Sequence, residues 1–120
     1  MNDFEKRISQ ATEGRKIREY EPTNLALEMV KLLPRFYIIT GFQMPMVEDM
    51  TLIARKLATD LLESYASLSV EEVELCFELG ARGQYGDFAG LNLRTFHRWL
   101  RIYKTSEARY RLATRRETAR

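Results

Sequence analysis

The sequence predicts an all-α protein that forms a single compact domain of four or five helices. Apolar residues recur at intervals of three and four along most of the chain, which is the period of an amphipathic helix. Residues that favour helix starts and helix ends stand at the borders of these stretches. A chain of 120 residues, 45% of them hydrophobic, is long enough to build one well-buried core. We expect this helical domain to span residues 1–110, with residues 111–120 as a basic C-terminal tail that can fray.

The first third of the chain has the least regular pattern. Apolar residues within 4–20 fit either one helix weakened by Gly14 or two shorter pieces. Residues 22–24 (Pro-Thr-Asn) suggest a break followed by a helix cap. Residues 25–33 then predict a short apolar helix that Pro34 ends, because proline cannot donate the helical hydrogen bond.

Residues 34–47 leave their conformation open. They are rich in aromatic and β-branched side chains, which suit a buried helical turn, a short strand or an apolar connector. A run this short contains too few periods to separate these alternatives.

Two helices are predicted in the middle of the chain. Apolar residues over 48–65 repeat at helical spacing and define one stripe that faces the core. Ser69 and Glu72 form the sequence pattern of a capping box, in which each side chain accepts a hydrogen bond from an early backbone N–H. The helix that follows should stop close to Gly80.

The last helix is predicted over residues 93–110, with Asn92 as its N-cap. At 100° per residue its apolar side chains fall on one side of the helix: Phe96, Trp99, Leu100, Tyr103 and Tyr110. Polar and basic side chains fall on the opposite side: Arg94, Arg98, Arg101, Thr105 and Arg109. The helix is therefore expected to present an aromatic seam to the core and an arginine row to solvent.

Charge is distributed unevenly along a chain whose net charge is only +2. Residues 61–90 carry a net charge of −5, whereas residues 91–120 carry +7. Arginine outnumbers lysine by 14 to 5 in the whole chain, and the planar guanidinium suits phosphate groups and guanine edges. The last quarter of the chain therefore favours an anionic partner.

A helix-turn-helix-like element can be placed near residues 82–104. Gly86 would allow close packing of the first helix, Gly90 would form the turn, and Asn92 would start the recognition helix. The nucleic-acid-binding side chains of that helix would be Asn92, Arg94, His97, Arg98 and Arg101. The alternative is a capped terminal helix after a glycine-rich connector, whose arginines are simply solvated.

Other classes of function find little support. Cys76 falls on an apolar helix face and His97 lies among arginines, so no catalytic dyad, metal site or cofactor site is expected. The glycines lack the Lys-Ser/Thr ending of a nucleotide-binding loop. No transmembrane stretch or secretory signal is recognised. We expect a cytoplasmic, non-enzymatic protein with no membrane partner and no small-molecule substrate.

One resemblance adds context. Within residues 50–110, glycines, aromatic residues and a cap recur in a spaced pattern: Gly80, Gly83, Tyr85, Gly86, Gly90, Leu91, Asn92, Thr95, Phe96, Trp99, Leu100 and Tyr103. This pattern resembles small, largely uncharacterised helical proteins of bacteriophages and mobile genetic elements. The resemblance implies an accessory protein of replication, packaging or regulation, acting in the host cytoplasm if phage-encoded.

Two functions are therefore expected from the sequence. The first is a non-enzymatic accessory protein that binds DNA through the basic face of its last helix. The alternative is a protein–protein interaction or assembly module, such as a loader, an inhibitor or a structural component. That module would use the acidic residues 61–90 and the basic residues 91–120, either with a protein partner or in self-association.

Overall fold

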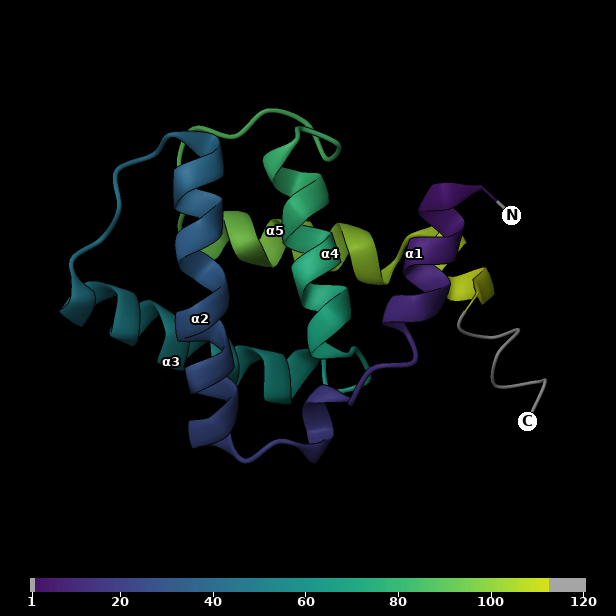
Figure 1. Cartoon of the computed structure of the whole chain (residues 1–120), viewed down its shortest axis with the longest axis horizontal. Helices are drawn as coiled ribbons and strands as arrows, with labels where there is room; N and C mark the ends of the chain where they lie inside the picture. Colours follow the sequence, from purple (N-terminus) through teal and green to yellow (C-terminus); the bar gives the residue numbers. More distant parts are fainter. Residues whose placement is uncertain (1, 113–120) are drawn as a thin grey trace.

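The computed structural model describes residues 2–112 and shows an all-α protein with two layers of helices. The expected tail at 111–120 lies outside the described residues from residue 113 onward. The first layer holds three helices: α1 (Asp3–Ala11), α2 (Pro22–Thr40) and α4 (Val70–Ala81). Helix α4 lies between the other two and contacts both (Figure 1).

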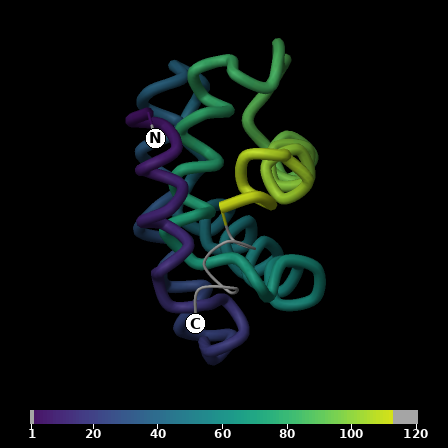
Figure 2. The backbone as a smooth tube through the Cα atoms, turned by 90° about the vertical axis from the view of Figure 1, so that its right-hand side faces the viewer, coloured from purple at the N-terminus to yellow at the C-terminus, as the bar shows by residue number. Residues whose placement is uncertain are grey.

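The second layer consists of α3 (Val47–Ser64) and α5 (Leu93–Lys104), which cross behind the first layer. In the side view of Figure 2, both helices are seen nearly end-on, on the side of the molecule away from α1. No helix in the described part of the chain is long and apolar enough to cross a bilayer.

The local signals in the middle of the chain are confirmed. Helix α3 covers the stretch predicted from its apolar stripe. The Ser69 hydroxyl accepts from the Glu72 backbone N–H at 3.0 Å, and the Glu72 carboxylate accepts from the Ser69 N–H at 3.2 Å. Helix α4 ends at Ala81, one residue after Gly80, and Gly83, two residues further on, takes the left-handed conformation with φ of 85°. These boundaries depend on residues that neighbour them in sequence, so periodicity and capping identified them.

The first third consists of two separate helical pieces rather than one helix. Asn2 caps α1, and a short 3-10 helix, η1 (Ile17–Glu19), follows after a turn at Gly14. The backbone N–H of Ile17 donates to the Leu68 carbonyl at 2.8 Å. This long-range bond fixes the connector against the start of α4.

The prediction that Pro34 ends a short helix is wrong. Helix α2 begins at Pro22 itself and runs through Pro34 to Thr40. Phe36 and Tyr37 follow the proline and are buried, so their packing compensates for the missing backbone hydrogen bond. The open stretch 34–47 therefore divides into a helix end, closed by left-handed Gly41, and a non-helical connector.

The last helix is shorter than the predicted 93–110. Helix α5 ends at Lys104, residues 105–106 interrupt it, and residues 107–112 resume a helical conformation. The interruption turns the chain, so Tyr110 is 68% exposed while Leu112 is buried. Tyr110 therefore does not continue the aromatic seam.

The tight turn of the expected helix-turn-helix is not formed. Residues 82–92 between α4 and α5 are non-helical, and Gly86 lies in this connection with φ of 98° instead of inside a first helix. The Tyr37 hydroxyl donates to the Leu91 carbonyl at 2.9 Å and holds the far end of the connection against α2. Gly83 and Gly86 within the connection favour this open course, because each lowers helix stability and takes a positive φ.

Candidate nucleic-acid interface

Helix α5 has the two faces that its sequence predicts. Phe96, Trp99 and Leu100 are fully buried and Tyr103 is 2% exposed. The ring of Phe96 lies 4.7 Å from that of Phe77 on α4, centroid to centroid. Because aromatic packing fixes this face, the orientation of the opposite face towards solvent is fixed as well.

Arg94 and Arg101 lie exposed on the outer face of α5. Within the described residues, neither side chain makes an ion pair or a hydrogen bond. They line a shallow hollow of about 320 Å³ together with Arg98 and residues 87–89 of the connection. This hollow concentrates positive charge, although the nearby Asp87 reduces it.

Arg98 has a different role from its neighbours. Its guanidinium donates to the carbonyl oxygens of Tyr85 and Asp87, at 2.5 Å and 2.9 Å. The side chain is half-buried and holds the connection 82–92 against α5. A Cβ added to Gly86 would stand 3.0 Å from a guanidinium nitrogen of Arg98, so this glycine makes room for the arginine. Arg98 therefore positions the wall of the hollow.

His97 and Asn92 are also engaged within the protein. His97 Nε2 lies 2.7 Å from a carboxylate oxygen of Asp60, which links α5 to α3. The Asn92 side-chain oxygen accepts from the Thr95 backbone N–H at 3.2 Å and caps α5. Of the five side chains predicted to bind nucleic acid, Arg94 and Arg101 are thus the two without a hydrogen-bond or ion-pair partner in the described part of the chain.

The arginine row is shorter than the sequence suggests. Helical periodicity places Arg109 on the same face as Arg101, but the interruption at residues 105–106 turns it inward to the buried carboxylate of Glu72. The distance from Arg109 Nε to that carboxylate is 2.9 Å, and the Tyr103 hydroxyl donates to the same oxygen at 2.6 Å. This arginine anchors the C-terminal segment to the core.

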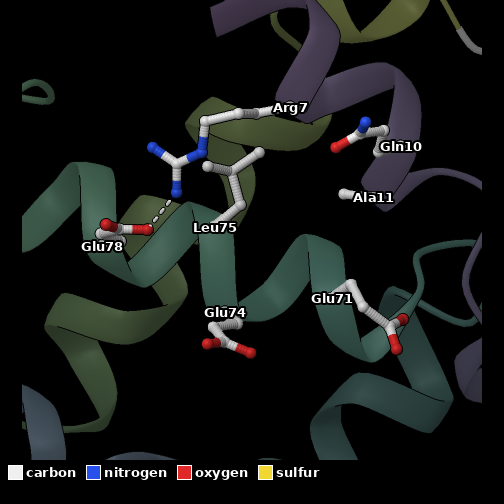
Figure 3. A pocket seen from close by; sticks show the side chains of 7 residues that line it. All are labelled: Arg7, Gln10, Ala11, Glu71, Glu74, Leu75 and Glu78. Carbon is white, nitrogen blue, oxygen red and sulfur yellow. Dashed lines mark hydrogen bonds and ion pairs between the residues drawn. The ribbon is translucent and has the colours of Figure 1, made fainter.

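The acidic stretch 61–90 is partly paired within the described part of the chain, through Glu72, Glu74 and Glu78. Glu78 of α4 pairs with Arg7 of α1 and with Arg82, while Glu74 pairs with Arg35 at 2.9 Å. Figure 3 shows the hollow between α1 and α4 where the pair formed by Arg7 and Glu78 lies. The acidic segment therefore offers a partner less negative charge than its sequence indicates.

The surroundings of Cys76 do not favour a role as a catalytic nucleophile. The thiol is buried, and burial raises its pKa above the ordinary value of 9.0, so it stays protonated at neutral pH. Within residues 2–112, no group of three or more His, Cys, Asp or Glu side chains could hold a metal ion.

Sequence reasoning missed the residues that define the hollow and its supports. Asp60 contacts His97, and residues 87–89 line the same hollow as Arg94, but both relationships arise from tertiary contacts. The one usable signal was Gly86, because a glycine beside an arginine-rich helix can mark a close approach.

Comparisons of this chain with protein-family models, with curated proteins and with solved structures give no match.

Proposed function

We propose that this protein is a non-enzymatic, DNA-associated accessory protein that binds DNA through the outer face of α5. The observation that carries the proposal is the exposure of Arg94 and Arg101 on one face of a rigidly packed helix, with no partner in the described residues. Exposed arginines without intramolecular partners are available to phosphate oxygens, which they can bind in a bidentate manner.

The placement of α5 supports this role. Figure 2 shows the helix at the edge of the molecule in the second layer, with no other described helix outside it. A surface helix of this kind can approach a DNA groove without rearrangement. The proposal does not need a tight helix-turn-helix, since α4 supports α5 through their packed aromatic side chains. Replication, packaging or regulation in a phage or mobile element, in the host cytoplasm, is the setting that the resemblance suggests.

Fluorescence anisotropy with a labelled duplex of about two helical turns tests the proposal across about 50 to 200 mM salt. The double variant Arg94→Ala/Arg101→Ala should weaken binding by about tenfold or more at low salt. It should also reduce the slope of log affinity against log salt by about two, because two phosphate contacts are lost.

A matched control is Arg18→Ala/Arg55→Ala, which removes two exposed arginines from η1 and α3 and leaves α5 intact. This control should keep most of the affinity. Arg98 is left unchanged in both variants because its loss would disturb the connection. Negligible affinity at low salt, or equal affinity of both double variants, would exclude DNA binding through α5.

A protein-interaction role is the second candidate, and exposed apolar side chains favour it. Ile38 at the end of α2 is 72% exposed, and Met46 and Val47 at the start of α3 are 71% and 79% exposed. Apolar side chains this accessible are typical of contact surfaces when they form a contiguous patch. Light scattering at high protein concentration tests self-association, and a monomer there would exclude it.

A further inference from the structure

Apart from Arg94 and Arg101, the polar side chains near the start of α5 that could read bases are occupied, and this restricts how DNA can be recognised. Asn92 caps the helix, and the Thr95 hydroxyl donates to the Gly90 carbonyl at 2.7 Å. His97 is bound to Asp60. Residues 87–89 line the same hollow as Arg94 and Thr95 of the first turn of α5, so the connection flanks this end of the helix. Base readout by a recognition helix relies on those N-terminal side chains.

The two available arginines have a spacing that fits a duplex. Arg94 and Arg101 are seven residues apart, which corresponds to a rise of about 10.5 Å along the helix axis. The major groove of B-DNA is about 12 Å wide. A helix laid across the groove would therefore bring the two guanidinium groups to phosphates on opposite strands.

Single-stranded nucleic acid would need a stacking surface, and α5 offers none in its described surroundings. Binding proteins for single strands stack bases on exposed aromatic side chains. The large exposed aromatic residues in the described chain are Phe4 and Tyr110, and both lie outside α5. Phe88 lines the hollow, but its ring packs edge-on against Trp99 at 5.1 Å.

From these three observations we infer that the ligand is duplex DNA, bound through its phosphates without base readout. Helix α5 bridges the major groove, and Arg94 and Arg101 contact opposite strands. This inference rests on the proposed function. Its added content is that the nucleic acid is double-stranded and that its phosphates, not its bases, are recognised.

The test compares two duplexes of unrelated sequence with the matching single strands, using anisotropy at low salt. The two duplexes should bind within about threefold of each other, because specific readout would separate them by about 10³-fold or more. Each single strand should bind more weakly than its duplex by about tenfold, since both stacking and the paired phosphates are missing.

A relocation variant tests the spacing at constant net charge. Arg101→Ala/Leu52→Arg removes one arginine from α5 and places another at an exposed position of α3. If the arginines act as a pair across the groove, this variant should lose as much affinity as Arg101→Ala alone. Both variants should unfold at a similar urea concentration, since positions 101 and 52 are exposed.

The outcomes separate the inference from the proposed function. Single strands that bind as tightly as duplexes, a strong preference for one duplex sequence, or full affinity of the relocation variant would each overturn the inference while DNA binding stands. The absence of binding to every DNA would overturn both.

Discussion

The indole ring of Trp99 packs directly on the backbone of Gly80, where α5 crosses α4. A Cβ added to Gly80 would stand 2.2 Å from Cδ2 of the indole, well inside van der Waals contact. Trp99 is fully buried, and Phe77 and Phe88 pack against it. Glycine at position 80 therefore sets how closely α5 approaches the first layer, and hence where the outer face of α5 lies.

Gly80→Ala should destabilise the protein by about 2 kcal/mol. Alanine is ordinarily the better helix former by about 1 kcal/mol, so propensity alone predicts stabilisation. The steric conflict with the Trp99 ring should prevail because the ring is buried and cannot move aside. The free energy of unfolding in urea measures the change.

Gly14→Ala is the matched control. A Cβ there would stand 1.8 Å from a carboxylate oxygen of Glu71, which is closer than the 2.2 Å between a Cβ at position 80 and the Trp99 ring. Glu71 is exposed, however, and its flexible carboxylate can rotate away, which leaves only a tight contact of 3.1 Å to the Cβ of Ser69 that a shift of a few tenths of an ångström relieves. This variant should cost about 0.5 kcal/mol or less. A larger loss for Gly14→Ala than for Gly80→Ala would contradict the account of the helix crossing.

Arg109→Ala should cost about 3 kcal/mol, because it leaves the buried carboxylate of Glu72 without its charged partner. Arg111→Ala, two residues later, removes only a surface pair with Glu5 and should cost less than about 1 kcal/mol. Urea unfolding of both variants gives the comparison. Similar losses would show that the C-terminal segment is not anchored through Glu72.

Local signals account for the part of the fold that the sequence predicts. The capping box at Ser69 and Glu72 and the apolar stripe of α3 each depend on residues a few positions apart. The continuation of α2 through Pro34 depends instead on the burial of Phe36 and Tyr37, a tertiary effect that outweighs the local preference.

The candidate site is likewise predictable only as far as it depends on residues close together in the sequence. The arginine face of α5 follows from helical periodicity, and Arg94 and Arg101 are exposed as expected. The partners of Arg98 and His97 are set by the connection and by α3, which are distant in sequence. Periodicity gives the direction of a side chain but not the groups that it meets.

Arg98→Ala should loosen the connection 82–92 without unfolding α5. Two hydrogen bonds from a charged donor are lost, so we expect backbone amides there to exchange with solvent about tenfold faster. Arg98→Lys should not restore protection, because one ammonium group cannot reproduce the planar fork that reaches two carbonyls. Hydrogen–deuterium exchange measures both variants.

The control for this experiment is Arg101→Ala, which removes an exposed arginine one turn along α5. Exchange in the connection should remain unchanged in this variant. Equal exchange rates in Arg98→Ala and in the unmodified protein would show that other contacts, such as the bond from Tyr37 to Leu91, are sufficient to hold the connection.

The protein should lose stability above about pH 10, and Tyr103 should contribute to the loss. Burial, followed by the Glu72 carboxylate, raises the pKa of the Tyr103 hydroxyl above its ordinary value of 10.0. The unfolded chain therefore releases this proton first, so the stabilisation is complete below pH 10 and declines as pH rises further. Tyr103→Phe should reduce the slope of unfolding free energy above pH 10 by about 1.4 kcal/mol per pH unit. Urea unfolding between about pH 8 and 11 measures this slope, and an unchanged slope would mean that Tyr103 ionises equally in both states.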